Sequence, residues 1–199
     1  MKFLFSRRVP SSLGLGLLMA TFAASSAQAA VNTEGCRTPE YFQAFSYAKD
    51  SNWYTSIPGD TNDSFTGQGW TLSGGAKIVT TTLSDGATGQ VLDLPSGSKA
   101  SSPVICVTSL YPTARGIVRN VKGAEGVQFF VEYEGTKTWE TARNTGQFHG
   151  SQTAWTLGSP VNLQPLNVLG WQPMRITLIP GGKTSEFQVY DLYIDPRMR

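Results

Sequence analysis

The fold of this chain is decided most clearly by the stretch Val-Gln-Phe-Phe-Val-Glu-Tyr-Glu, residues 127–134. Its apolar residues alternate, so that Val127, Phe129, Val131 and Tyr133 lie on one face of an extended strand. Such alternation is typical of a strand with one face in a core and the other in water. The stretch therefore predicts a β-strand that covers one side of a hydrophobic core.

Further strand-like runs lie on both sides of this stretch, separated by Gly and Pro, and no long helical period interrupts them. Several short strands at this spacing predict an all-β sandwich or barrel. At most a turn or two of helix is expected over residues 38–47, where the aromatic residues fit neither period. The strand-like runs cover residues 76–83, 90–94, 104–107, 174–178 and 187–194.

The last of these runs changes its apolar phase. Phe187 and Val189 share one parity, whereas Leu192 and Ile194 have the other. A β-bulge near Tyr190-Asp191 would turn all four side chains toward one core. A strand that is buried on both faces is the alternative explanation.

The first 29 residues have the order of a secretory signal peptide. A basic stretch from Lys2 to Arg8 precedes an apolar run over residues 13–24, and the small residues Ala27-Gln28-Ala29 follow. We predict cleavage after Ala29. A transmembrane anchor is the alternative, but the run is shorter than the ~20 residues that span a bilayer. We expect a secreted, extracellular protein, free of the membrane after cleavage, with one β-sandwich domain over residues 30–199.

The charge of the predicted mature chain does not favour a nucleic-acid partner. The full chain has 16 Lys+Arg and 14 Asp+Glu, and three of the basic residues (Lys2, Arg7 and Arg8) leave with the signal peptide, so that 13 basic residues face 14 acidic ones. A nearly neutral chain of this kind gives no support for a nucleic-acid partner. Composition does not indicate an oligomeric state.

The chain contains two cysteines, Cys36 and Cys106. An even pair in an oxidising compartment predicts a disulfide. A metal site or a reactive thiol is the alternative, but two cysteines and the single histidine make at most three ligands, fewer than the four of a structural zinc site.

Several segments together resemble a family of small secreted proteins of actinobacteria and related soil bacteria, to which no activity is attached. No single segment is specific, whereas their order and spacing cover nearly the whole mature chain. The resemblance implies a jelly-roll β-sandwich, similar to galactose-binding-like and carbohydrate-binding modules. The segments are Cys36, residues 50–59, Phe65, residues 69–76, residues 92–107, residues 111–115, Arg119-Asn120 and residues 187–199.

Jelly-roll sugar binders often hold a structural calcium ion, for which Asp60, Asp63 and Asp191 are the candidate ligands here. Calcium needs several oxygen ligands, and these three acids could meet if the first and last strands are neighbours. Two departures from the family pattern weaken this hypothesis: Thr66 follows Phe65 where relatives carry an acid, and Tyr190 precedes Asp191 where relatives carry a second aspartate. We therefore expect no cofactor.

No catalytic machinery is recognisable, and we expect a protein that is not an enzyme. His149 is the only histidine, in residues 146–150, which are typical of a turn, and no Gly-x-Ser-x-Gly motif accompanies it. A glycosidase needs two facing carboxylates, and nothing in the sequence pairs two acids. Glu132 and Glu134 share a strand face, which is typical of a solvated surface.

The five tryptophans suggest a binding surface instead. Trp53 and Trp70 are expected in the core, whereas Trp139 and Trp155 have more polar neighbours. Aromatic rings can stack on sugar rings, and Arg143 and Gln152 could bond the sugar hydroxyls. Packing roles for both tryptophans are the alternative.

Arg115 and Arg119, four residues apart, are predicted on one face of a strand. They could present donors to a ligand, but a surface pair bridged to Glu132 or Glu134 is the preferred interpretation. The sequence thus favours a secreted, non-catalytic binding module for carbohydrate or cell-wall glycan. A structural or protein-interaction protein of the cell surface, with no small ligand, is the alternative.

Overall fold

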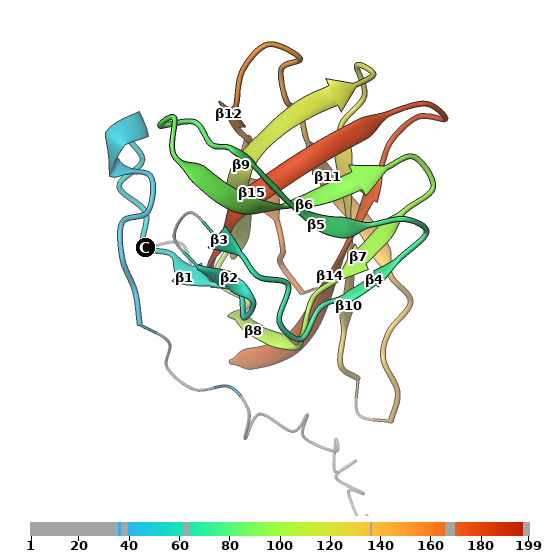
Figure 1. Cartoon of the computed structure of the whole chain (residues 1–199). Helices are drawn as coiled ribbons and strands as arrows, with labels where there is room; N and C mark the ends of the chain where they lie inside the picture. Colours follow the sequence, from blue (N-terminus) through green and yellow to red (C-terminus); the bar gives the residue numbers. More distant parts are fainter. Residues whose placement is uncertain (1–35, 37–39, 62–63, 136, 166–169, 197–199) are drawn as a thin grey trace, which may run out of the picture.

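A computed structural model describes residues 36, 40–61, 64–135, 137–165 and 170–196. These residues form two β-sheets packed face to face (Figure 1). The chain passes repeatedly from one sheet to the other, as expected of a jelly roll. The predicted all-β sandwich is confirmed. No helix among the described residues is long and apolar enough to cross a membrane.

The nine-stranded sheet has β9 and β15 at its centre, and most of its pairings are antiparallel, with a short parallel bridge between β3 and β6. Its strands are β1 (Thr55–Ser56), β2 (Asp60–Thr61), β3 (Ser64–Phe65), β5 (Lys77–Thr82), β6 (Thr88–Pro95), β9 (Thr113–Lys122), β12 (Thr156–Leu157), β13 (Val161–Asn162) and β15 (Glu186–Asp195).

The six-stranded sheet has the order β11-β10-β14-β7-β4, and β8 extends it by pairing with β14. The stretch that predicted a strand from its alternation is β10. The strands of the six-stranded sheet are β4 (Thr71–Ser73), β7 (Lys99–Ser101), β8 (Ile105–Thr108), β10 (Val127–Tyr133), β11 (Arg143–Phe148) and β14 (Trp171–Pro180).

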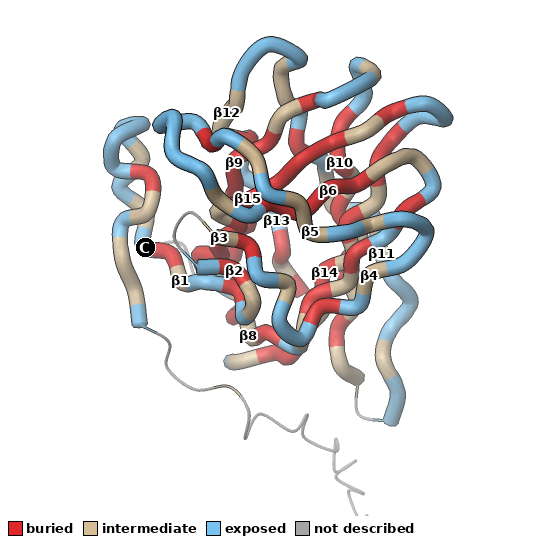
Figure 2. Tube along the Cα trace, viewed as in Figure 1, coloured by how far each residue is buried: buried red, intermediate tan, exposed pale blue. Residues whose placement is uncertain are grey.

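The main core lies between the two sheets, where buried positions alternate with more exposed ones along the strands (Figure 2). In β10 the residues Val127, Phe129, Val131 and Tyr133 are all buried in this core, as their parity predicts. At about 25 cal/mol per Å² of apolar surface, removal of such side chains from water is the main stabilising contribution.

Strand β15 contains the predicted bulge. Its pairing with β9 shifts between Tyr190 and Tyr193, and Asp191 has a positive φ of 48°. The shift places Leu192 in the main core together with the residues of opposite parity before it. The alternative explanation also holds in part, because Tyr190 and Tyr193 are buried on the opposite face of the strand.

That opposite face of the nine-stranded sheet is covered by the segment of residues 40–54, which holds the 3-10 helix η1 (Ser46–Ala48) and leads into β1. Phe45 and Tyr54 of this segment are fully buried, and Phe45 packs 5.6 Å from Tyr193 between ring centroids. The predicted disulfide between Cys36 and Cys106 is present and joins Cys36, which precedes this segment in the sequence, to β8. A second apolar cluster therefore lies outside the sandwich proper.

Candidate functional site

The outer face of the six-stranded sheet is partly exposed along its central strands. Phe130 and Glu132 of β10 point away from the core and are half-buried. Phe130 pairs with Thr177 of β14, and Glu132 pairs with Arg175 two residues farther along. On its other side Phe130 pairs with the exposed Asn144 of β11. The alternation that buries one face of β10 thus places an aromatic ring among polar side chains on the other.

Trp139 joins this face from the loop between β10 and β11. The guanidinium carbon of Arg175 lies 3.9 Å from the centroid of the Trp139 ring, a cation–π distance. Arg175 also lies 4.0 Å from the carboxylate of Glu132, in a partly exposed pair of the kind that contributes at most about 1 kcal/mol. We call this surface the aromatic platform, and its residues are Phe130, Glu132, Trp139, Arg175 and Thr177.

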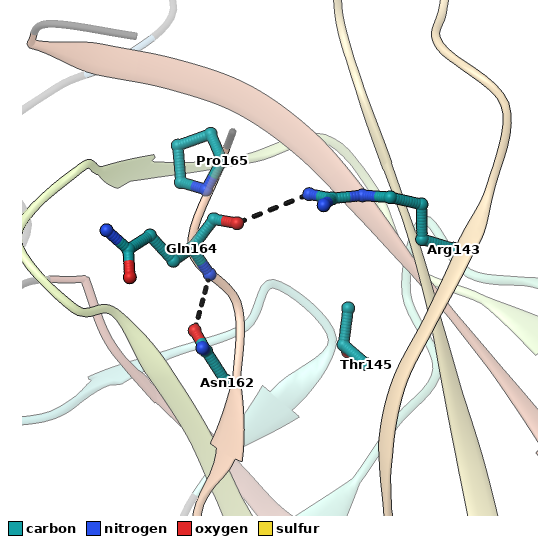
Figure 3. A pocket seen from close by; sticks show the side chains of 5 residues that line it. All are labelled: Arg143, Thr145, Asn162, Gln164 and Pro165. Carbon is teal, nitrogen blue, oxygen red and sulfur yellow. Dashed lines mark hydrogen bonds between the residues drawn. The ribbon is translucent and has the colours of Figure 1, made fainter. Parts of the chain in front are cut away.

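A pocket of about 310 Å³ lies beside β11 at one edge of the sandwich (Figure 3). Arg143 and Thr145 of β11 line one side of this pocket, and Asn162 of β13 with Gln164 and Pro165 lines the other. Arg143 Nη2 donates to the carbonyl of Gln164 at 3.2 Å, and the Gln164 N–H donates to Asn162 Oδ1 at 2.8 Å. The pocket therefore joins an edge strand of one sheet to an edge strand of the other.

A register shift in β11 shapes this pocket. Phe129 pairs with Gly146 and Phe130 pairs with Asn144, so that Thr145 is an extra residue between them. Gly146 has a φ of 151°, and a Cβ on it would lie 3.2 Å from a methyl group of Val161. Bulges redirect side chains beside binding sites, and this one occurs where β11 approaches β13.

The charge in the pocket comes from Arg143. Its guanidinium carbon lies 5.0 Å from the centroid of the buried Tyr133 ring, whose hydroxyl donates to the carbonyl of Leu163 at 2.6 Å. Burial raises the pKa of Tyr133 to about 12, although the positive charge of Arg143 opposes the increase. Arg143 Nε and Thr145 Oγ1 are both shielded from water and have no hydrogen-bond partner.

The structure does not bring the four predicted ligand residues together. Arg143 lies at the pocket and Trp139 on the aromatic platform. Trp155 lies at the nine-stranded sheet instead, where its indole donates to the carbonyl of Thr82 at 2.9 Å. Gln152 is exposed and donates to the carbonyl of Gly123 at 2.9 Å.

Trp155 is also packed between two other side chains. Its ring lies edge-on to Tyr190, with centroids 4.8 Å apart, and the guanidinium carbon of Arg119 lies 4.5 Å from its centroid. A ligand role for Trp155 and Gln152 stays a prediction, separate from the platform.

The preferred interpretation of the arginine pair is wrong. Arg115 forms an ion pair with Asp50, and Arg119 donates to Gln188 and Thr81. All three partners lie on the nine-stranded sheet or its cover, because β9 belongs to that sheet, whereas Glu132 belongs to the other.

The structure also places the two tryptophans expected in the core and the turn expected around His149. Trp70 lies in the main core, as predicted, but Trp53 is 42% exposed, so that its expected core position is wrong. Residues 146–148 belong to strand β11, so that the turn expected around His149 begins only after Phe148. His149 is exposed, and its Nε2 lies 2.8 Å from Gln147 Nε2.

Two of the three candidate calcium ligands lie near one another at the bulge of β15. The Asp60 carboxylate accepts hydrogen bonds from the backbone N–H groups of Asp191 and Leu192. Burial raises the pKa of Asp60 well above its usual value, with a further contribution from the charge of Asp191. Asp63 lies outside the described residues, and among those residues no three acidic, histidine or cysteine side chains gather in a metal-binding group. The calcium hypothesis stays untested.

Asp60 Oδ1 is buried without a hydrogen-bond partner in the described part of the chain. Because burial raises the pKa of Asp60 and no third ligand side chain joins Asp60 and Asp191 among the described residues, we expect added calcium to leave the midpoint of thermal unfolding unchanged. The measurement compares the midpoint in calcium with the midpoint in chelator, for wild type and Asp60→Asn. A calcium-dependent increase in wild type that is absent from Asp60→Asn would contradict this expectation and identify a bound metal.

The sequence interpretation missed seven residues of the candidate site. They are Phe130, Arg175 and Thr177 of the aromatic platform and Thr145, Asn162, Gln164 and Pro165 of the pocket. Phe130 had a signal, since it is an aromatic residue of outward parity in a strictly alternating strand. The four pocket residues had none, because the pocket forms only when β11 and β13, from different sheets, become neighbours.

The fold and the site together define a two-sheet β-sandwich with an external aromatic platform and an edge pocket. No protein-family model matches the chain, and no curated protein is similar to it in sequence. The chain is similar to solved carbohydrate-binding modules. One is the CBM22-1 xylan-binding domain of Xyn10C from Paenibacillus barcinonensis, with 15% identity, a TM-score of 0.47, and coverage of 66% of this chain and 88% of that one.

A second is the C-terminal family 22 carbohydrate-binding module of Xyn10B from Clostridium thermocellum, with 14% identity, a TM-score of 0.45, and coverage of 74% and 96% of the two chains. A third is TmCBM61, solved with β-1,4-galactotriose, with 14% identity, a TM-score of 0.42, and coverage of 70% and 98%. These are distant similarities, and the two-sheet architecture is established by the strand pairing described above.

Proposed function

We propose that this protein is a secreted, non-catalytic module that binds an extracellular glycan through the aromatic platform. The proposal includes the first 29 residues as a cleaved signal peptide. The supporting observation is that Phe130 and Trp139 lie on one sheet face with the polar pair Glu132–Arg175 between them. Aromatic faces bind the apolar faces of sugar rings, and charged or amide groups beside them bond the hydroxyls.

The arrangement favours a glycan over a protein partner. Diagonal neighbours on a sheet face are ~7–8 Å apart, so that Phe130 and the Arg175–Trp139 stack can contact different parts of one extended ligand. A protein-binding surface would instead expose a continuous apolar patch, whereas Thr177 and Ser101 add hydroxyls to this face, 2.8 Å apart. The platform has a single acidic residue, Glu132, which is paired with Arg175, and this arrangement supports binding and not catalysis by two facing carboxylates.

We expect Trp139→Ala to weaken binding to the cognate glycan at least about tenfold, which corresponds to ~1.4 kcal/mol, as is usual for an aromatic residue at the centre of a binding surface. The mature, oxidised protein is screened on a glycan array and on insoluble polysaccharides. The affinity for the best ligand is then measured for wild type, Trp139→Ala and Phe130→Ala.

Trp53→Ala is the matched control, because Trp53 is an exposed tryptophan of the segment that covers the other sheet. It should bind as wild type does. Absence of binding to every glycan by folded wild-type protein would reject the proposal. It would direct attention to a protein partner at Leu110 and Tyr111, which are 56% and 63% exposed in the loop between β8 and β9.

A further inference from the structure

We infer that the pocket beside β11 binds the carboxylate of an acidic sugar, so that the ligand of this protein is a uronic-acid-containing glycan. The inference rests on the proposed function, because it specifies the substrate class of the same module. It concerns a different set of residues, however. The pocket residues Arg143, Thr145, Asn162, Gln164 and Pro165 are distinct from those of the aromatic platform.

The positive charge of Arg143 has no acidic partner in an ion pair within the described part of the chain. Arg143 is half-buried, and among the described residues no carboxylate lies within ion-pair distance of its guanidinium. The pocket lining itself contains no acidic residue. Arg115 provides a contrast within the same protein, because its guanidinium is paired with Asp50. A partly desolvated guanidinium without a counterion attracts an anionic ligand group.

Two polar atoms of the residues that line the pocket have no hydrogen-bond partner in the described part of the protein. Arg143 donates to the carbonyl of Gln164 and also hydrogen-bonds the Tyr133 side chain, whereas its Nε–H has no acceptor. Thr145 Oγ1 likewise has no partner. Both atoms are covered in the unliganded protein, so a ligand reaches them only when the Arg143 and Thr145 side chains shift, and unpaired polar atoms in such places destabilise a protein. A ligand group that paired with them would remove that cost.

The shape of the guanidinium and its single charge favour a carboxylate as the anionic group of the ligand. A guanidinium presents N–H groups in a planar fork that matches the two oxygens of a carboxylate. The pocket supplies a single cation, which suits a group of one negative charge better than a phosphate monoester, whose charge is about −1.5 to −2 at neutral pH. Its volume of about 310 Å³ is at the lower end of the range of small-molecule sites, which suits a sugar-sized group.

The experiment compares an oligogalacturonate with its methyl ester, because esterification removes the charge and keeps the sugar backbone. We expect wild type to bind the acid at least about tenfold more tightly than the ester, as charge-assisted bonds require. Arg143→Gln should abolish this preference while binding of the ester is retained. Lys122→Gln is the control, since it removes one exposed positive charge from the end of β9.

Thr145→Val keeps the inference testable if Arg143→Gln fails to fold. It removes a hydroxyl that has no partner in the protein, so that stability should not fall, whereas affinity for the acid should fall severalfold. Ser98→Ala is the matched control, because Ser98 Oγ is also buried and unpartnered but lies in the turn between β6 and β7. It should leave affinity unchanged.

The outcomes separate this inference from the proposed function. Equal affinity for acid and ester in wild type, or a preference that survives Arg143→Gln, would overturn the inference while leaving a neutral-glycan module in place. Preference for a sulfated neutral oligosaccharide over oligogalacturonate would also overturn it. If no oligosaccharide binds but galacturonate shifts the NMR signals of Arg143 Hε and the Thr145 methyl group, the pocket is supported and the platform proposal fails.

Discussion

Replacement of both Cys36 and Cys106 by serine is expected to lower the free energy of unfolding by about 4 kcal/mol. The disulfide joins residues 70 apart, and the chain-entropy model gives a loss of this size for a loop of that length. Urea unfolding at neutral pH measures the change. The midpoint of thermal unfolding should fall by about 10 °C for a domain of this size.

The location of the disulfide explains why its loss should affect more than one end of the chain. It ties the chain just before the segment of residues 40–54 to β8, and Phe45 and Tyr54 of that segment bury the second apolar cluster against Tyr193. Wild type in reducing agent should match the double variant, and the variant should not respond to reducing agent. A loss below about 1 kcal/mol would show that the segment stays docked through its aromatic packing alone.

Arg115→Met is expected to lower the free energy of unfolding by about 3 kcal/mol. Arg115 and Asp50 form an ion pair with side chains 19% and 7% exposed, and Arg115 Nε also donates to the carbonyl of Gly158 at 2.9 Å. Removal of one partner leaves the carboxylate buried without its counterion, which usually costs about 3–5 kcal/mol. We expect the lower end of that range because Arg115 is partly solvated.

The pH dependence gives an independent test of the same pair. Burial favours the neutral form of Asp50, but hydrogen bonds from Tyr54, Asn52 and Arg115 outweigh it and hold the pKa of Asp50 below its usual value. The stabilisation is therefore present above the pKa of the unfolded chain, near 3.8, and is lost as the pH falls through the lower pKa of the folded state. Arg115→Met should weaken this loss of stability in acid.

A double-mutant cycle with Asp50→Asn separates the charge from the packing. If the unpaired carboxylate causes the loss in Arg115→Met, the double variant should be less destabilised than the sum of the two single variants. Strict additivity, with an unchanged pH profile in Arg115→Met, would show that the two residues contribute independently and would reject the coupling.

The local features of the sequence predicted the strands well. The alternation of β10 placed Val127, Phe129, Val131 and Tyr133 in the core. The phase change in β15 predicted a bulge near Tyr190 and Asp191, which the register with β9 confirms. These predictions succeed because side-chain direction in a strand depends on parity alone, and parity can be counted along the chain.

The partners of outward-facing side chains were predicted poorly. Arg115 and Arg119 share a face, as expected, but they contact Asp50 and Gln188 and not Glu132 or Glu134. Trp139 and Trp155 were grouped by their polar neighbours in sequence, whereas they lie on different sheets. Sequence neighbours describe the environment along one strand, but side-chain contacts across a sheet depend on which strands become adjacent.

The sequence by itself determined the all-β class, the inward face of the main strands and the pairing of the only two cysteines. Tertiary structure alone decided the platform and the pocket. The Glu132–Arg175 pair requires β10 beside β14, and the pocket requires Arg143 of β11 beside Gln164 after β13. The physical reason is that a period of two is a local property of the backbone, whereas strand order and register follow from burying both sheet faces together.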